Sequence, residues 1–252
     1  MNIAEKWLLP TMNLDAAEIA RENALGLEIS EFCTAFNMDS DFAHWDETVR
    51  QKITSVNRLT FHAPYNELCP AAIDPLIRDV SFRRYEQAYL LMRGYGVKKM
   101  ILHSGYIPLL YQHNWFVRHS ADFWRKFLAD KPDDVQLCLE NVFEPTPALL
   151  IDIIEAVHDR RLHLCLDIGH AALAGAAASL REWINRCAPY LAHVHLHNNY
   201  GDDDTHNALN DGNIDVAAVI RHISGSAPQA TLTIEAIDPR SSVAWLKTQG
   251  FL

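Results

Sequence analysis

Short apolar runs alternate with longer amphipathic segments along the chain. Each run has the length and residue types of a buried strand, and each is followed by a segment whose apolar positions have helical spacing. The pattern therefore predicts eight strands that alternate with helices. The predicted strands cover residues 3–9, 25–29, 58–62, 98–103, 135–140, 162–167, 193–197 and 231–236.

Several of the predicted helices have recognisable starts. Asp74-Pro75 precedes an apolar stripe that ends at Gly94, Thr146-Pro147 precedes a second stripe, and Asp215 precedes a third. Eight alternating units in 252 residues are typical of a (β/α)8 (TIM) barrel that occupies 1–252 as a single α/β domain. A doubly wound open sheet would give a similar pattern, but no Gly-x-Gly-x-x-Gly follows the first strand.

Six consecutive strands, the third to the eighth, end in residue types that commonly bind metal ions. Alternate residues of a barrel strand point inward, and the carboxyl ends of the strands form one mouth, where barrel enzymes place their chemistry. The intervening positions are leucine, isoleucine and phenylalanine, which suit the outer face. The inward strand-end residues are His62, His103, Glu140, Asp167, His195 or His197, and Glu235.

Three carboxylates at one mouth require a counter-charge, because burying an unpaired ion costs several kcal/mol. Lysine and arginine are absent from these strand ends, so divalent cations are expected, with zinc, manganese, cobalt or iron suited to histidine and carboxylate ligands. His170, just beyond the sixth strand, and Asp204 and His206, in the loop after the seventh, lie within reach of the same mouth. Asp202 and Asp203 are interpreted as a solvated loop.

Other residues have two interpretations. Glu28 could contact a substrate at the mouth, or form a supporting salt bridge. Tyr65 and Trp115 could line a pocket, or pack the loops. His193 is interpreted as structural, because it lies too deep if His195 is at the rim.

Composition and charge limit the function classes. The net charge of -10 includes no basic stretch, which argues weakly against nucleic acid, and the 13 histidines exceed what a structural role requires. The five cysteines form no C-x-x-C motif, which argues against a disulfide framework. The N-terminus does not resemble a signal peptide and no apolar run reaches ~18 residues, so a cytoplasmic protein without a membrane span is expected.

The strand-end motifs together resemble the xylose isomerase-like TIM-barrel superfamily, which includes sugar isomerases and epimerases and the endonuclease IV class of apurinic/apyrimidinic endonucleases (AP endonuclease family 2). The resemblance extends from about Gly26 to Pro239. The motifs that carry it are His62-Ala63-Pro64-Tyr65, His103-Ser104-Gly105, Leu139-Glu140-Asn141, Leu166-Asp167-Ile168-Gly169-His170, Val194-His195-Leu196-His197-Asn198 and Ile234-Glu235.

The resemblance implies two possible ligand sets. The isomerase branch holds one divalent ion, with ligands that match Glu140, Asp167, His195 and Glu235. The endonuclease branch holds three zinc ions, and its five further ligands match residues that this chain also has. These further residues are His62, His103, His170, Asp204 and His206.

Four departures from the endonuclease pattern fall in loops that would touch DNA. Asn66-Glu67-Leu68-Cys69 replaces an aliphatic stretch that ends in Asn, and Asp167-Ile168-Gly169-His170 replaces Asp-Thr-Cys-His. The segment from His195 to Tyr200 lacks the His-x-Asn-Asp and nearby Lys of that branch, and Asn210 replaces a glycine. The chain is also short for that branch, so a sugar-type substrate is favoured.

The leading hypothesis is a metal-dependent isomerase or epimerase that acts on a sugar, a sugar phosphate or a related polyol ketone through an enediolate. Glu140 and Glu235 would serve as base and acid, while His197, Glu28 and Tyr65 would contact the substrate. The alternatives are hydrolysis of abasic DNA by a three-zinc cluster, and an inosose-type dehydratase that uses the same site. A purely structural ion is disfavoured at an open mouth, and the oligomeric state stays open.

Overall fold

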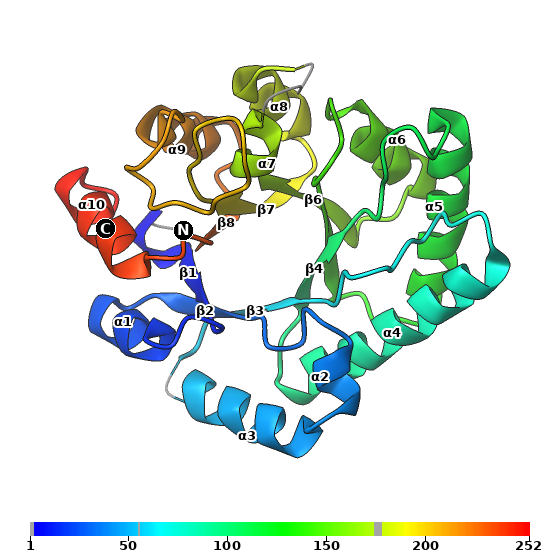
Figure 1. Ribbon diagram of the computed structural model, residues 1–252, viewed down its shortest axis with the longest axis horizontal. Helices are drawn as coiled ribbons and strands as arrows, with labels where there is room; N and C mark the ends of the chain where they lie inside the picture. Colours follow the sequence, from blue (N-terminus) through cyan, green and yellow to red (C-terminus); the bar gives the residue numbers. More distant parts are fainter. Residues whose placement is uncertain (1–2, 55, 174–177) are drawn as a thin grey trace.

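The strands form one closed parallel barrel in sequential order (Figure 1). This computed structural model describes residues 3–54, 56–173 and 178–252. Within these residues β1 pairs with both β2 and β8, which closes the barrel, excludes the open sheet and confirms the predicted (β/α)8 fold. The strands are β1 (Trp7–Pro10), β2 (Gly26–Ile29), β3 (Leu59–His62), β4 (Lys99–His103), β5 (Gln136–Glu140), β6 (Leu162–Asp167), β7 (Leu191–Leu196) and β8 (Thr231–Ile234).

The helices surround the barrel (Figure 1). A short 3-10 turn, Ile3–Glu5, precedes the first strand. In the described part of the chain, no helix is long and apolar enough to cross a membrane. The helices are α1 (Ala16–Asn23), α2 (Phe36–Asp39), α3 (Phe42–Ile53), α4 (Pro75–Gly94), α5 (His113–Leu128), α6 (Ala148–Val157), α7 (Ile168–Ala172), α8 (Leu180–Cys187), α9 (Val216–Ser226) and α10 (Pro239–Thr248).

The strand boundaries correct the sequence prediction at three places. The predicted first strand begins too early, because pairing with β8 starts only at Trp7, opposite Leu232. β7 begins at Leu191, two residues before the predicted His193, because Leu191 already pairs with Leu164 and an extra β7 residue, Ala192, precedes the pairing of His193 with Cys165. β7 and β8 end one residue before His197 and Glu235, so these two side chains leave from the loops directly above the barrel.

The predicted helix starts are only partly correct. Asp74 accepts a hydrogen bond from the Leu76 amide at 2.8 Å, and Asp215 accepts one from the Ala218 amide at 3.0 Å, as expected of N-caps. Thr146 does not cap its helix. Pro147 occupies the N-cap position of α6, and its ring has no oxygen that could accept from the helix amides.

The barrel separates a large outer apolar core from an interior that holds polar side chains beside a small apolar cluster of Ile101, Cys138, Cys165 and Ala192. Large side chains such as Trp7 and Phe61 fill the layer between strands and helices. Inside the barrel, the Lys99 ammonium on β4 donates to the Thr231 hydroxyl on β8 at 2.9 Å. His193, at 0% exposure, contacts the same hydroxyl through Nδ1. The interior therefore places charged and polar groups directly below the mouth.

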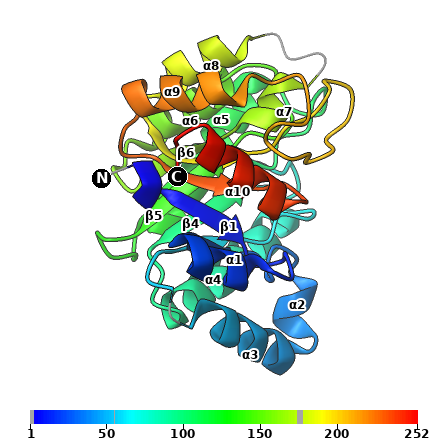
Figure 2. The same cartoon turned by 90° about the vertical axis from the view of Figure 1, so that its left-hand side faces the viewer.

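The loops at the carboxyl ends of the strands form the upper face of the molecule. The loop between β7 and α9, gold in Figure 2, projects at this end, and the short 3-10 turn Ile3–Glu5 lies at the opposite end of the barrel. Gly212 in this loop has a φ of 155° and packs so closely against Asn198 that a Cβ atom there would overlap the Asn198 side chain. The side-chain amide of Asn198 donates to the carbonyls of Leu209 and Ile214. This network fixes the start of the loop beside the mouth.

Candidate metal centre and cavity

Four side chains from four adjacent strands converge at the centre of the mouth. One potential ligand atom from each of Glu140, Asp167, His195 and Glu235 lies within 4.8 Å of all the others. His195 Nδ1 lies 3.1 Å from Glu140 Oε1 and 3.4 Å from Glu235 Oε2. The structure thus brings together the four residues that the sequence assigned to a single ion, and we call them the central cluster.

Glu140 also faces two histidines on its other side. Its Oε2 lies 3.4 Å from His62 Nε2 and 3.5 Å from His103 Nε2. His62, Glu140 and His195 form a second group whose ligand atoms share the same 4.8 Å limit. Glu140 therefore turns Oε1 toward His195 and Oε2 toward His62 and His103. A carboxylate placed in this way could bind two ions, one through each oxygen.

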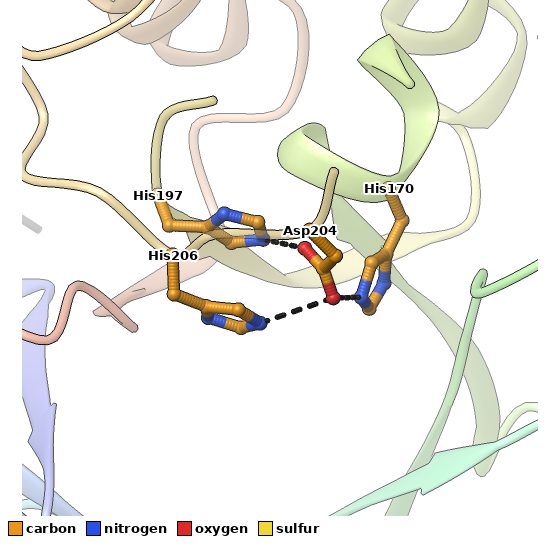
Figure 3. Close-up of side chains that lie close together, drawn as sticks. All are labelled: His170, His197, Asp204 and His206. Carbon is orange, nitrogen blue, oxygen red and sulfur yellow. Dashed lines mark hydrogen bonds and ion pairs between the residues drawn. The ribbon is translucent and has the colours of Figure 1, made fainter. Parts of the chain in front are cut away.

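A third group lies on the side of the mouth under the long loop. Figure 3 shows the Asp204 carboxylate between three imidazoles. Its Oδ2 lies 3.1 Å from His170 Nε2 and 3.3 Å from His206 Nε2, and its Oδ1 lies 3.7 Å from His197 Nε2. We call these four residues the loop cluster. The sequence assigned three of its members to metal binding, and named His197 as an alternative to His195 at the strand end and as a substrate contact.

Backbone carbonyls orient three of the histidines. The Nδ1 atoms of His62, His170 and His206 lie 2.8, 2.9 and 2.9 Å from the carbonyl oxygens of Ala63, Asn141 and Glu235. A carbonyl oxygen can only accept, so each Nδ1 carries the hydrogen and each Nε2 faces the acidic groups. This is how metal-binding histidines are commonly held, with one ring nitrogen anchored and the other presented.

The electrostatic balance differs among the carboxyls. Burial raises the pKa of Asp167, but the charges of His170 and His197 outweigh it and lower that pKa to about 2. Burial is also outweighed at Glu140, where His195 and His103 hold the pKa well below its usual value. The pKa of Glu235 is raised, by burial and by the neighbouring charge of Glu140. Negative charge is thus concentrated on Asp167 and Glu140.

Two buried carboxylate oxygens fit a cation better than they fit the protein around them. Glu140 Oε2 and Asp167 Oδ2 have no hydrogen-bond partner among the described residues. Buried polar atoms are almost always satisfied, so such orphans call for a missing partner. Both belong to the central cluster, whose mixture of one imidazole and three carboxylates suits a borderline divalent cation. These four residues could hold one ion.

A cavity of about 910 Å³ lies above the clusters. Asp167 and His195 lie below its floor, at 0% exposure. Asn141 supports this floor, because its side-chain amide exchanges two 2.9 Å hydrogen bonds with the backbone of Asp167. Sequence reasoning missed Asn141, although its place directly after a strand-end glutamate could have suggested it. The candidate residues that line the cavity are His62, Tyr65, His103, Glu140, His170, Asp204, His206 and Glu235.

Two of the expected substrate contacts do not reach the cavity. Glu28 and His197 are both at 0% exposure and neither lines it. Glu28 lies one layer deeper, where its oxygens approach His193 Nε2 and His195 Nε2 at 3.1 Å each. His197 is held beneath α7, with Nε2 3.1 Å from Asp167 Oδ1. Both side chains contact candidate ligands, and neither faces the cavity.

Of the two aromatic candidates, Tyr65 and Trp115, only the first lines the cavity. Tyr65 lines the cavity, and its ring stacks on that of His103 with centroids 4.2 Å apart. Trp115 does not line it and instead donates from its indole nitrogen to the Ala71 carbonyl at 3.1 Å, which packs the loops. Asp202 and Asp203 are exposed, as interpreted from the sequence.

Comparison with known proteins gives the family. The chain is a closed parallel TIM barrel whose strand ends carry histidines and carboxylates around one mouth. The sequence pattern of the xylose isomerase-like TIM barrel matches residues 20–249. The chain belongs to this family.

Individual relatives are distant. The uncharacterized protein MJ1311 of Methanocaldococcus jannaschii is 26% identical over 196 residues, which is 73% of this chain and 66% of that protein. A D-tagatose 3-epimerase-like protein is 22% identical with a TM-score of 0.77, over 97% of this chain and 96% of that one. The TTHB071 protein of Thermus thermophilus, from a crystal soaked with ZnCl2, is 23% identical with a TM-score of 0.74, over 98% and 97%. At these identities the solved structures establish the fold alone.

Proposed function

We propose that this protein is a divalent-metal-dependent epimerase or isomerase that acts on a sugar-type hydroxy ketone. The observation that carries the proposal is the central cluster at the floor of the cavity. The cavity volume of about 910 Å³ lies in the range of small-molecule sites, ~300–1,000 Å³. The description of structural neighbours as D-tagatose 3-epimerase-like, and as D-psicose 3-epimerase of Clostridium cellulolyticum H10 with D-tagatose, supports this class of reaction.

The residues divide the work by position. Glu140, Asp167, His195 and Glu235 would hold the ion, which would supply the positive charge that makes a proton beside a carbonyl more acidic. Glu140 on β5 and Glu235 after β8 both face the cavity and come from different sides of the barrel. One carboxylate can therefore accept a proton from one face of a substrate carbon while the other returns a proton to the opposite face.

Hydrolysis of abasic DNA is the second candidate, because all nine residues of the three-zinc pattern surround one mouth. The cavity argues against it, since its walls enclose a volume suited to a small molecule and the net charge of -10 repels a phosphate backbone. Incubation of the zinc-loaded protein with an abasic duplex tests this alternative. Nicking that a Glu235→Gln variant loses would favour the nuclease.

Proton exchange tests the proposed function directly. The protein loaded with manganese, cobalt or zinc is incubated with D-fructose, D-tagatose and D-psicose in deuterated water, and deuterium at carbon is measured by NMR. Glu140→Gln and Glu235→Gln variants, shown to fold by circular dichroism, should each lose about 100- to 10,000-fold in exchange rate, as expected for loss of an acid or base. Loss of water from the substrate without epimerisation would indicate the dehydratase instead.

The matched control is Asp203→Asn, a carboxylate removed from the exposed part of the long loop. This variant should exchange deuterium at the rate of the unchanged protein. Undiminished exchange in both folded glutamine variants would contradict the proposal, because neither carboxylate would then take part in proton transfer.

A further inference from the structure

The upper walls of the cavity are apolar, in contrast to its floor. Met12, Ile107, Leu110, Phe143 and Ile237 line it, and each remains substantially exposed in the structure. They come from the loops after β1, β4, β5 and β8, so the apolar surface extends around much of the mouth. Exposed apolar surface gathered beside a polar site is typical of ligand-binding grooves.

The charges on the cavity lining all have one sign apart from histidine. Among the described residues, neither lysine nor arginine lines the cavity, whereas Glu67, Glu140, Asp204 and Glu235 do. Phosphate groups are recognised by arginine, lysine or a helix N-terminus. The lining therefore lacks the side chains that commonly recognise the phosphate group of a phosphorylated sugar.

The cavity is also larger and more apolar than a free sugar requires. Its volume of about 910 Å³ is near the upper end of sites for drug-sized ligands, ~300–1,000 Å³. A free hexose carries oxygen on every carbon and would leave Phe143 and Leu110 uncovered above it. An apolar group on the ligand would cover these side chains and remove their surface from water, which favours binding.

We infer that the ligand of this cavity is an uncharged hydroxy ketone of the sugar type that carries an apolar substituent, and that sugar phosphates are disfavoured. The inference rests on the proposed function for the polar half of the ligand, which meets the floor at Glu140 and Glu235. The apolar half lies against the upper walls, between Ile107 and Leu110 of one loop and Phe143 of the next.

Three ketoses that differ only in the group carried on oxygen 6 test the inference. D-fructose, 6-O-benzyl-D-fructose and D-fructose 6-phosphate are titrated into the metal-loaded protein, and their dissociation constants are measured by calorimetry. The benzyl ketose should bind roughly tenfold or more tightly than D-fructose, because a buried aromatic group removes apolar area from water. D-fructose 6-phosphate should bind no more tightly than D-fructose.

A matched pair of neighbouring leucines locates the apolar contact. Leu110 lines the cavity, whereas Leu109 does not line it and is fully exposed to solvent. Leu110→Ala should weaken binding of the benzyl ketose by about three- to tenfold and leave binding of D-fructose unchanged. Leu109→Ala should change neither.

The outcomes separate this inference from the proposed function. Tighter binding of D-fructose 6-phosphate than of D-fructose would overturn the inference, as would benzyl ketose binding no tighter than D-fructose, or equal losses in the two leucine variants. If D-fructose still exchanges deuterium in that case, the proposed function stands. Tight binding of the benzyl ketose without deuterium exchange from any ketose would instead support the apolar site and contradict the epimerase proposal.

Discussion

His195 lies between acidic groups on both sides of its ring. Nε2 is 3.1 Å from Glu28 Oε1, and Nδ1 is 3.1 Å from Glu140 Oε1. The hydroxyls of Thr60 and Thr233 donate to the other oxygen of Glu28, at 2.9 and 3.0 Å, which holds this buried carboxylate in place. The negative charge of Glu28 beside Nε2 can therefore favour a hydrogen of His195 on that nitrogen and leave the Nδ1 lone pair for a cation.

Replacing Glu28 by glutamine should weaken metal binding. The amide cannot act as an ionic acceptor for His195 Nε2–H, so affinity for zinc should fall about 10- to 100-fold, as is usual for such supporting residues. Competition titration with a chromogenic chelator measures this change. Glu67→Gln, at an exposed position on the cavity wall, is the control and should keep the original affinity. An equal loss in both variants would show that general charge, not the contact between Glu28 and His195, is responsible.

The sequence predicts the strand-end residues well and their depth poorly. His62, His103 and Glu140 follow from the two-residue period of inward positions together with the shared carboxyl end of the strands. Glu28 could not be placed by the same means, because its height depends on the register between strands. Glu28 pairs with Thr60, two residues before His62, and so it lies one layer below the mouth.

At the scale of elements, α7 and the end of β7 form one packing unit. A Cβ atom at Gly169 would lie 1.9 Å from Cε1 of His197, so any side chain there would overlap the imidazole. His197 Nε2 in turn forms a hydrogen bond with Oδ1 of Asp167, which is the N-cap residue of α7. The sequence showed two separate departures from the endonuclease pattern, glycine for cysteine and histidine for asparagine. The structure shows that the glycine makes room for the histidine.

This packing predicts a coupled pair of substitutions. Gly169→Ala should lower the free energy of unfolding by roughly 1–3 kcal/mol through overpacking. His197→Asn should remove most of that penalty, so the double variant should be more stable than the sum of the two single effects. Urea denaturation of the four proteins measures the coupling.

Gly225→Ala in α9 is the matched control, because nothing lies within 4 Å of a Cβ atom there. It should leave stability unchanged or raise it slightly, since alanine favours helix more than glycine does. Additive effects of Gly169→Ala and His197→Asn would contradict the overlap.

Element boundaries depend on contacts that hydrophobic pattern does not record. The interior strands were predicted from their apolar runs to within two residues at each end. The 3-10 turn Ile3–Glu5 was predicted as strand, because its apolar isoleucine suits either structure and only pairing with β8 decides where β1 begins. The bulge at Ala192 in β7 is likewise a property of two strands together, because only the pairing with β6 shows that Leu191 belongs to the strand.

At the scale of the whole molecule, removing metal should lower thermal stability. An ion that binds only the folded chain stabilises it by about 2.7 kcal/mol at a hundredfold excess over its dissociation constant. For a chain of this size, chelation should lower the Tm by roughly 5–10 °C. Calorimetric scans with zinc and with EDTA, together with elemental analysis of the zinc-loaded protein, measure the shift and the number of ions.

Two aspartate variants show whether the shift arises at the proposed centre. Asp167→Asn should abolish most of the metal-dependent shift, because it removes a buried ligand of the central cluster. Asp203→Asn, in the exposed loop, should keep the shift. A metal-dependent shift of full size in folded Asp167→Asn protein would place the stabilising ion elsewhere.

The six strands that carry the candidate ligands also decide when the centre can exist during folding. Its residues run from His62 on β3 to Glu235 after β8, and the barrel closes only when β8 meets β1 at Trp7. Contacts between parts of a chain so distant in sequence form slowly and late. The residues that would bind an ion therefore come together only late in folding. Such an ion acts chiefly on the unfolding rate, so metal lengthens the lifetime of the finished barrel without hastening its formation.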